Sequence, residues 1–432
     1  MKLLTFRGGI HPDDKKEQTS GVPIVELKPD EFMVFPMSQH IGAPCAPCVE
    51  VGDYVKMYQK IGEAQGFVSA NIFSSVSGTV TAIEPRAVAS GQKVLSVVIQ
   101  NDFKDEKEDV KPLPADASIA DIALAAGAVG MGGATFPTHV KLSPPKDKPV
   151  DTVIINGSEC EPYLTSDHRV LLERGEEVAG GLDLVLKKLG VKRGFIAIEN
   201  NKADAAENMR KICEKYPDIE VVNLKTKYPQ GSEKQLINAV TGREVPSGGL
   251  PADVGVIVLN VDSATVLYNA AKYGTPLTSR IVTVAGSAIK EPKNFRARLG
   301  MSAQSLIDAA GGFVCKPGKV IFGGPMMGMA VSDTDLPIIK GTGSILCLSE
   351  EEATLPESMA CIRCGRCVSA CPIHLLPLNF CNYAEVRDWD SCKKYNILDC
   401  IECGSCSYVC PSKRHIVQSI RLAKQALREQ KK

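Results

Sequence analysis

The sequence lacks three features that mark whole classes of protein. Residues 1–25 contain no basic start followed by an apolar core and a small-residue cleavage site, so we expect no export signal. The long uncharged stretch between Asp121 and Lys141 is rich in glycine and interrupted by Pro137, whereas a membrane-spanning helix needs about 20 mostly apolar residues. Equal numbers of basic and acidic residues, 50 of each, leave no formal net charge and exclude bulk attraction to nucleic acid. These absences predict an intracellular protein that meets a membrane only through partners or through its tail.

Cysteine, by contrast, is abundant. The chain has 16 cysteines among 432 residues, and 44% of its residues are hydrophobic. Without an export signal, so many cysteines indicate a reducing compartment, in which disulfides are rare. The length leaves room for roughly three or four domains.

Eight of the cysteines form two copies of one motif near the C-terminus. The first copy starts at Cys361 and ends at Cys371-Pro372, and the second starts at Cys400 and ends at Cys410-Pro411. Three thiolates at this spacing bind three corners of an iron–sulfur cube, and the fourth cysteine, followed by proline, binds the other cube. The motifs predict two 4Fe-4S clusters, one held by Cys361, Cys364, Cys367 and Cys410 (cluster 1) and one held by Cys371, Cys400, Cys403 and Cys406 (cluster 2).

Two other interpretations of these cysteines are zinc sites and disulfides. Zinc usually binds paired CxxC knuckles separated by a longer loop, and disulfides belong to secreted domains. Of the remaining cysteines, we expect Cys45 and Cys48 to be small, partly buried residues in spite of their redox-like spacing. The others are expected to pack in the interior: Cys160, Cys213, Cys315, Cys347, Cys381 and Cys392.

The pattern of apolar residues changes along the chain. Residues 34–102 alternate short β-branched runs with glycine turns, which predicts a small all-β unit similar to the barrel-sandwich hybrid of lipoyl and biotinyl domains. Its hairpin Val68–Ile72 has no lysine, so a swinging arm is not expected. From about residue 151, strands and helices alternate, which predicts a parallel sheet with helices on both faces. Residues 279–350 return to β character.

A glycine-rich string and a polar turn form the second chemical signal. The string Gly130-Met-Gly-Gly-Ala-Thr-Phe-Pro-Thr-His-Val-Lys141 offers backbone N–H groups and a mobile cation to a phosphate. No clear strand precedes it, so it differs from the Rossmann fingerprint. The turn Asn156-Gly-Ser-Glu-Cys-Glu-Pro162 follows a predicted strand, where an amide and two carboxylates can bind a ribose or a ring N–H.

Together with Tyr228-Pro-Gln-Gly-Ser-Glu233, these two segments resemble the flavin- and NADH-binding subunit of respiratory complex I. When the β-rich N-terminus and the paired cluster motifs are added, the chain is similar to the RnfC family, the C subunits of Rnf electron-transport complexes, over roughly residues 30–411. The resemblance implies a multidomain α+β fold. Its expected parts are a barrel-sandwich hybrid (1–110), an FMN- and NAD-binding α/β domain (111–278), a soluble-ligand-binding β-grasp domain (279–350), an α-helical, ferredoxin-like domain with two 4Fe-4S clusters (351–412) and a basic amphipathic tail (413–432).

The resemblance also implies roles for single residues. Gly130, Gly132, Gly133 and Lys141 would hold the phosphate side of FMN. The flavin would be lined by Asn156, Glu159, Tyr228, Gly231 and Asn260. Phe136 would stack on the dinucleotide, and Glu161 and Glu233 would accept hydrogen bonds from it. The chain departs from the complex I pattern at Ser158 and Ser232, where those relatives carry acidic residues.

The implied function follows from the two cofactors. NADH gives up two electrons at once and an iron–sulfur cube accepts one, so a flavin must stand between them. The resemblance implies a ferredoxin:NAD oxidoreductase subunit that passes electrons between NAD(H), FMN and two clusters, coupled to ion transport. Its partners would be the membrane and iron–sulfur subunits of the complex and, indirectly, ferredoxin. It would lie peripherally on the cytoplasmic face of the cell membrane. The alternatives are a soluble cobalamin reductase of a microcompartment and an electron-wiring module without flavin.

The tail has its own pattern. Residues 412–432 carry seven Lys or Arg against the single acid Glu429, and Ile416, Ile420, Ala423 and Leu427 share one helical face. Such a helix docks on anionic lipid or on an acidic partner, or it packs by its apolar side on the cluster domain.

Overall fold

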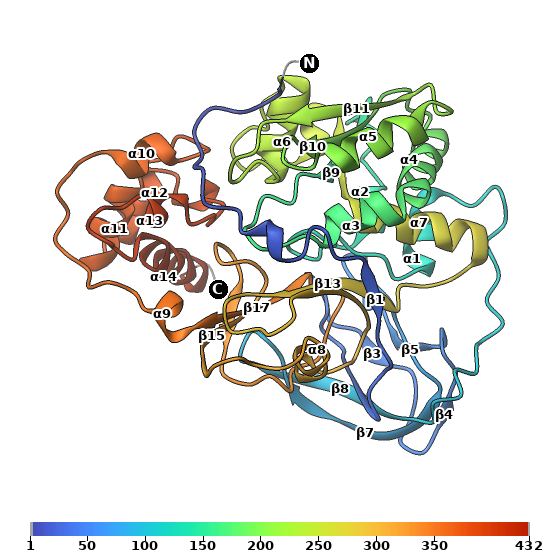
Figure 1. Ribbon diagram of the computed structural model, residues 1–432. Helices are drawn as coiled ribbons and strands as arrows, with labels where there is room; N and C mark the ends of the chain where they lie inside the picture. The colour runs from blue at the N-terminus through green and yellow to red at the C-terminus, as the bar shows by residue number, and fades with distance from the viewer. Residues whose placement is uncertain (1–2, 431–432) are drawn as a thin grey trace.

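The computed structural model describes residues 3–430, which form the four units seen in Figure 1. The central unit contains a four-stranded sheet of order β11-β10-β9-β12, in which every neighbouring pair is parallel. Its strands are β9 (Thr152–Gly157), β10 (Gly194–Glu199), β11 (Ile219–Leu224) and β12 (Val256–Asn260). The predicted parallel sheet is therefore present.

Helices cover both faces of this sheet because its strands are apolar on both sides. Val153 and Ile155 face a core with α1, α4, α5 and α7, whereas Ile154 faces a core with α6. The helices are α1 (Ile119–Ala125), α2 (Thr138–Lys141), α3 (Ser166–Glu173), α4 (Gly175–Leu189), α5 (Ala203–Cys213), α6 (Glu233–Thr241) and α7 (Val261–Tyr273), with the 3-10 turn η2 (Pro251–Val254). Asn260 caps α7 by accepting a hydrogen bond from the N–H of Asp262.

The N-terminal β unit has two small antiparallel sheets. One has the order β2-β8-β7-β4 and the other β3-β5-β6. The strands are β2 (Phe32–Pro36), β3 (Ala46–Pro47), β4 (Tyr54–Val55), β5 (Lys60–Glu63), β6 (Ile72–Phe73), β7 (Gly78–Ala87) and β8 (Lys93–Asn101).

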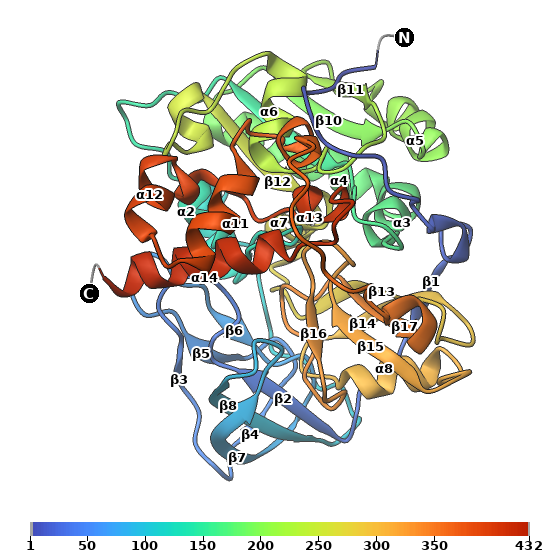
Figure 2. The same ribbon diagram turned by 90° about the vertical axis from the view of Figure 1, so that its left-hand side faces the viewer.

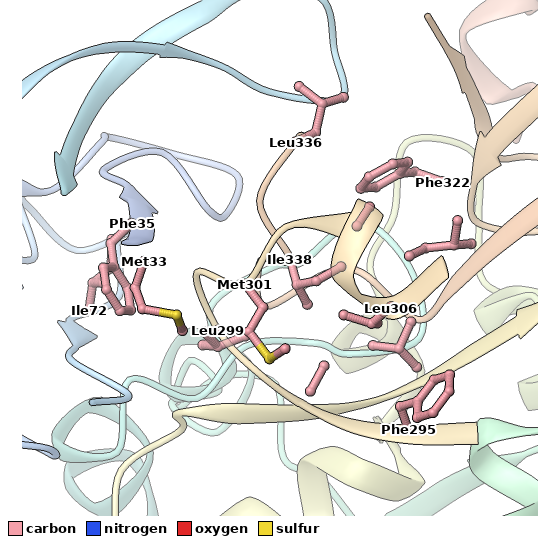
Figure 3. Close-up of a cluster of buried hydrophobic side chains, with 14 of the residues drawn as sticks. Met33, Phe35, Ile72, Phe295, Leu299, Met301, Leu306, Phe322, Leu336 and Ile338 are labelled. Atoms are coloured by element: carbon pink, nitrogen blue, oxygen red, sulfur yellow. The ribbon is translucent and has the colours of Figure 1, made fainter. Parts of the chain in front are cut away.

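Residues 279–349 and the short N-terminal strand β1 form a six-stranded mixed sheet with the order β1-β14-β13-β17-β15-β16. Its elements are β1 (Ile24–Glu26), β13 (Ser279–Ala285), β14 (Lys293–Arg298), β15 (Pro317–Phe322), β16 (Met329–Val331), β17 (Ser344–Ser349) and α8 (Ala303–Ala309), followed by α9 (Glu350–Ala353). It shares one core with the β unit, since Met33 and Phe35 belong to the same buried cluster as Leu299 and Met301 (Figure 3).

The cluster cysteines lie among short helices. These are α10 (Arg366–Ala370), α11 (Pro377–Glu385), α12 (Trp389–Lys394), α13 (Ser405–Tyr408) and α14 (Ile416–Glu429), with the 3-10 turn η3 (Ile397–Asp399). Helix α14 lies against α11 (Figure 2). All four apolar residues of its predicted face are buried in one core with Phe380. The tail helix is therefore packed on the cluster unit, and its apolar side is already covered. Residues 431–432 lie outside the described part of the chain.

An extended N-terminal segment joins three of these units. This segment, residues 3–23, is called the strap, and Figure 1 shows it in dark blue between the α/β unit and the cluster helices. Leu4 bridges Leu224 of β11, and the N–H of Gly9 donates to the carbonyl of Ala370 at 3.0 Å. The strap includes the 3-10 turn η1 (Lys16–Gln18) and leads into β1, which pairs with β14. The expected domain boundary at residue 110 stays a prediction, but this segment packs outside the β unit.

The buried face of α14 gives the first prediction. Ile420 is fully buried, whereas Leu422 of the same helix is 56% exposed. Ile420→Ala leaves a cavity in the core and should lower the free energy of unfolding by about 2–5 kcal/mol. Leu422→Ala is the matched control and should change it by less than about 0.5 kcal/mol. Denaturant titration of the intact protein, followed by circular dichroism, measures both. Equal midpoints for the two variants would mean that α14 is not part of the cluster core.

Candidate functional site

The candidate flavin site lies at the carboxyl edge of the parallel sheet. Asn156 near the end of β9 and Asn260 at the end of β12 are paired in register. From β9 the chain continues to β10 and β11 on one side, and it returns by α6 to β12 on the other. The strand order therefore reverses between β9 and β12. Open α/β sheets bind their ligands outside the carboxyl ends of the strands at such a reversal.

The glycine-rich loop lies against this edge and against the start of α7. The N–H of Gly130 donates to the carbonyl of Phe136 at 2.8 Å, and the N–H of Met131 donates to Oγ of Ser263 at 3.2 Å. A Cβ on Gly132 would stand 2.9 Å from Nδ2 of Asn260, so a side chain at this position would displace the Asn260 amide.

Gly132 and Gly133 themselves are exposed. A Cβ on Gly133 would meet nothing within 4 Å. The N–H groups of both glycines make no hydrogen bond within residues 3–430. Unpaired backbone donors at the carboxyl edge of a parallel sheet suit the phosphate of a bound cofactor, so the loop fits the predicted group.

Lys141 and Glu233 meet beside the loop. Nζ of Lys141 donates to Oε1 of Glu233 at 2.6 Å and to the carbonyl of Val258 at 3.3 Å. Both side chains are about one third exposed or less, 26% and 36%. The structure thus brings together a cation predicted for the phosphate and an acid predicted for the dinucleotide, at the end of α2 and the start of α6.

The turn after β9 uses its predicted polar residues inside the protein. Nδ2 of Asn156 donates to the carbonyl of Gly231 at 2.7 Å, which joins the turn to the 228–231 segment. The carboxylate of Glu159 accepts the N–H groups of Asp167 at 2.7 Å and His168 at 3.1 Å. Glu159 therefore stabilises the start of α3, where a negative charge is favourable.

Glu161 is held in a similar way by a loop of the neighbouring unit. Its carboxylate accepts the N–H groups of Met326 at 3.1 Å and Met327 at 2.9 Å. Gly324 gives it room, because a Cβ there would stand 2.3 Å from Oε2 of Glu161. Burial raises the pKa of Glu161 to about 7, and the two N–H donors act against this rise.

The sequence did not predict two residues behind the glycine-rich loop, one acidic (Asp167) and one basic (Arg280). Oδ2 of Asp167 accepts from Nδ2 of Asn260 at 2.7 Å, and burial, followed by the charge of Glu159, raises the pKa of Asp167 to about 8. Arg280 is buried, lies 3.3 Å from Asp262 and donates to the carbonyl of Met131 at 2.9 Å. These contacts join segments far apart in the sequence, so periodicity and spacing carried no signal for them.

Three further polar residues of the candidate site, Tyr228, Ser158 and Gln230, are buried. Tyr228 is buried, and its hydroxyl donates to the carbonyl of Cys403 at 2.7 Å, so it reaches the cluster cysteines. Oγ of Ser158 and the amide of Gln230 are buried and have no hydrogen-bond partner within residues 3–430. Phe136 is half-buried in the loop.

The eight motif cysteines line two cavities in the predicted sets. Cys361, Cys364, Cys367 and Cys410 line one of about 440 Å³. Cys371, Cys400, Cys403 and Cys406 line another of about 350 Å³. Among residues 3–430, no three His, Cys, Asp or Glu side chains are close enough to share one metal ion. Burial raises the pKa of Cys400 to about 11 and that of Cys406 further. Iron must therefore displace protons from these thiols.

The predicted interior position is wrong for Cys315, which is exposed because it lies in the loop between α8 and β15, and Cys160 is only partly buried. Cys392 is fully buried in the cluster core, while Cys381 lines the cavity of cluster 1, where Nη2 of Arg414 approaches its sulfur at 3.3 Å. Cys45 is buried, with its sulfur 3.6 Å from Nε2 of His40, and Cys48 is exposed.

Comparison with known proteins agrees with this architecture. The model of the Nuo51 FMN-binding domain matches residues 124–269, and the model of the RnfC barrel sandwich hybrid domain matches residues 4–104. The SLBB domain matches residues 281–330, and the 4Fe-4S dicluster domain matches residues 360–414. The fold and the site therefore define an electron-transfer protein with FMN and iron–sulfur clusters.

Relatives over the whole length narrow this class. The C subunit of the Na+-translocating ferredoxin:NAD+ oxidoreductase complex of Acetobacterium woodii is 52% identical over 100% of this chain and 99% of its own. The C subunit of the proton-translocating complex of Clostridium ljungdahlii is 49% identical over 98% of this chain and 94% of its own. The chain belongs to the RnfC family, the C subunits of Rnf-type ion-translocating oxidoreductase complexes. The predicted family and fold class are confirmed.

A solved structure shares part of the fold. The NAD+-reducing nickel–iron hydrogenase in its air-oxidized state gives a TM-score of 0.50 at 15% identity, over 72% of this chain and 66% of that chain. At this identity the likeness concerns the fold alone. Within residues 3–430, no helix has the length and apolar character needed to cross a bilayer.

The two cysteine sets give the second prediction. Cys364→Ala and Cys410→Ala should remove one and the same cluster signal in electron paramagnetic resonance, and Cys371→Ala and Cys406→Ala should remove the other. Cys392→Ala, a buried cysteine outside both sets, is the control and should keep about eight irons and eight sulfides per chain. Loss of the same signal in Cys371→Ala and Cys410→Ala would contradict the crossed arrangement, and zinc in place of iron would contradict both sets.

Glu161 gives the third prediction. Its pKa is 4.5 as a free group and about 7 when folded, so between these values the folded protein holds a proton that the unfolded chain has released. The contribution of this carboxyl to stability is thus full below pH 4.5 and is lost as the pH rises through 7. Glu161→Gln does not titrate, so its unfolding temperature relative to the wild type should rise from pH 5 to pH 8. The exposed Glu351→Gln is the control, and parallel pH curves for wild type and Glu161→Gln would refute the assignment.

Proposed function

We propose that this chain is the peripheral NADH-binding subunit of an Rnf-type complex and passes electrons between NAD(H), FMN and two 4Fe-4S clusters during ferredoxin:NAD oxidoreduction coupled to ion transport. The observation that carries this proposal is the segment from Tyr228 to Gly231. One end of it contacts Asn156 at the sheet edge and the other end contacts Cys403 of the cluster 2 set. A single four-residue segment thus connects the two redox sites.

Bound FMN would take two electrons from NADH and release them one at a time. The unpaired N–H groups of Gly132 and Gly133 and the cation of Lys141 support a phosphate position over the loop, with Gly130 fixing the turn. Asn156, Gly231 and Asn260 lie at the reversal point of the sheet and support a ring position beside it.

The acidic residues divide into two groups in this proposal. Glu159 and Glu161 bind backbone N–H groups within the protein, so we assign them the shaping of the turn on which the flavin packs. Glu233 is partly exposed beside Lys141, and Phe136 is half-buried in the loop. These two residues remain for contacts with the nicotinamide dinucleotide. Tyr228 acts at the back of the site, between the flavin and cluster 2.

We further propose that the chain meets ferredoxin only indirectly and the membrane only through the other subunits of the complex, at the cytoplasmic face. The packing of α14 supports this, because the four apolar residues of its predicted face are buried in the cluster core and are not free for lipid. Two of its cations, Arg421 and Lys424, are paired with Glu402. Family membership favours this role over that of a microcompartment cobalamin reductase.

The fourth prediction tests the flavin position. A Cβ on Gly133 would meet no protein atom within 4 Å, and the backbone of Gly133 is outside the left-handed region. Gly133→Val should therefore fold normally, yet its side chain would occupy the space proposed for the phosphate. We expect FMN affinity, measured by flavin fluorescence, to fall at least about tenfold, which corresponds to about 1.4 kcal/mol.

Gly21→Val is the matched control, since Gly21 also has free space around it and ordinary backbone angles. It should bind FMN like the wild type and bleach with NADH. Unchanged FMN affinity in Gly133→Val would refute the proposed position. A wild-type protein that contains iron and sulfide but binds no flavin would refute the function itself and favour the wiring module.

A further inference from the structure

The connection between β5 and β6 is a well-fixed turn of the N-terminal β unit. It comprises residues 64–71, is called the β5–β6 loop, and carries no lysine for a swinging arm. Its own side chains hold its backbone: Oδ1 of Asn71 accepts the N–H of Ala64 at 3.0 Å, and Oγ of Ser69 accepts the N–H of Gln65 at 3.1 Å. Such a turn can hold a neighbouring segment in place, because it does not itself need to be ordered.

The β5–β6 loop contacts the α/β unit just before the glycine-rich loop begins. Nδ2 of Asn71 donates to the carbonyl of Leu124, in the last turn of α1, at 3.3 Å. Gly127 follows with a left-handed backbone (φ 62°), and a Cβ there would stand 2.3 Å from the carbonyl oxygen of Asn71. The two backbones therefore touch three residues before Gly130, at a position where only glycine leaves enough room.

A fully buried lysine from the third unit joins these two backbones. Nζ of Lys340 donates to the carbonyl of Asn71 at 2.5 Å and to the carbonyl of Gly127 at 2.8 Å. Burying an amine is tolerated where carbonyl oxygens replace its water, as they do here. The next residue, Gly341, passes the glycine-rich loop itself, since a Cβ there would stand 2.3 Å from Cγ2 of Thr135. Lys340 thus links all three units at the start of the loop.

The same β5–β6 loop also contacts the chain just after the glycine-rich loop. His139 of α2 is buried, and its Nε2 lies 2.8 Å from the carbonyl oxygen of Phe67. A carbonyl oxygen only accepts, so Nε2 of His139 carries the hydrogen and donates it. The ring of Phe67 meets the ring of His139 edge to face, with 5.7 Å between the ring centres. His139 is two residues before Lys141, the cation proposed for the FMN phosphate.

The glycine-rich loop is therefore held at both ends and free at its tip. Its two ends pair with each other, because the N–H of Thr138 donates to the carbonyl of Ala128 at 3.0 Å. The β5–β6 loop contacts the residue before this pair, Gly127, and the residue after it, His139. The exposed tip carries the unpaired N–H groups of the glycines at 132 and 133. Fixing the ends of a binding loop reduces the entropy that a ligand must remove when it binds.

We propose that the β5–β6 loop holds the glycine-rich loop in the conformation that binds the phosphate of FMN, with Lys340 and His139 as positioning residues. The inference rests on the proposed function and deepens it, because it gives the β unit a role at the flavin site. Neither side chain is a ligand of the flavin, since Nζ of Lys340 and Nε2 of His139 donate to carbonyls of the protein. They act through the backbone on the N–H groups that face the phosphate.

The test compares FMN with riboflavin, which lacks the phosphate, on the full chain with its iron–sulfur clusters in place. Lys340→Met keeps most of the apolar stem and removes both hydrogen bonds of the amine. Its dissociation constant for FMN, measured by flavin fluorescence, should rise at least about tenfold. Its dissociation constant for riboflavin should change less than about twofold, because riboflavin makes no phosphate contact that could be lost. In the flavin-free chain, amide hydrogen exchange of residues 128–139 should become faster than in the wild type.

Lys188→Met is the matched control. Nζ of Lys188 also donates to two backbone carbonyls, those of Ala115 at 2.6 Å and Ala117 at 2.7 Å, but these lie outside the glycine-rich loop. This variant should bind both flavins like the wild type. A second pair of variants decides the matter if Lys340→Met does not fold. His139→Leu should weaken FMN binding as Lys340→Met does, whereas His139→Gln keeps an N–H donor for the carbonyl of Phe67 and should bind FMN like the wild type.

Two results would overturn the inference. One is unchanged FMN affinity in Lys340→Met and His139→Leu. The other is an equal loss of affinity for FMN and riboflavin, since the β5–β6 loop would then support only the fold. A wild type that binds no FMN would refute the proposed function, which is a different result from normal FMN binding by all the variants.

Discussion

The hydrogen bond from the Tyr228 hydroxyl to the Cys403 carbonyl joins the two halves of the redox machinery. Tyr228 is held from the other side by the strap, because its backbone exchanges hydrogen bonds of 2.8 and 2.7 Å with Ile10. The same segment continues to Gly231, which Asn156 binds at the sheet edge. Three units that are far apart in sequence are thus fixed to one short turn. Sites built on rigid, mutually supported elements keep their geometry better than sites on free loops.

The flavin edge depends on polar groups that do not touch the flavin. Glu159 and Glu161 both use their carboxylates on backbone N–H groups, one at the start of α3 and one in the 326–327 loop. Asp167 and Arg280 stand behind the glycine loop and connect it to α7 and β13. The acidic character of the turn after β9 therefore sets the shape of the site. Among the groups that remain for a ligand within residues 3–430 are the N–H donors of Gly132 and Gly133, with Oγ of Ser158 and the amide of Gln230 behind them.

The sequence predicted those parts of the molecule whose signal is local. Cysteine spacing fixes a cluster loop within about ten residues, and the alternation of apolar strands with helices fixes a parallel sheet. The ligand sets that include Cys371 and Cys410 could be predicted for the same reason, because in such a motif the fourth cysteine, before the proline, binds the other cube. The pairing of β1 with β14 could not be predicted from the sequence, because it joins residues as far apart as Ile24 and Asn294 and β1 is only three residues long. The contact of Tyr228 with Cys403 could not be predicted for a related reason. The sequence around a tyrosine near the flavin turn is the same whether its side chain faces the ligand or the clusters.

Buried lysines explain how the strap holds its place. Nζ of Lys16 donates to the carbonyl of Glu161 at 2.9 Å, and Nζ of Lys227 donates to the carbonyl of Gly8 at 2.9 Å and lies 3.7 Å from the ring centre of Phe6. Burial lowers the pKa of both amines, that of Lys227 to about 8, so each cation loses hydration on folding. Such a loss is tolerated only where carbonyl oxygens replace the water. The carbonyls come from the strap and from the turn after β9, so removing either segment would leave a buried cation without acceptors. The strap and the turn after β9 therefore depend on each other, since each supplies carbonyl oxygens to a cation buried between them.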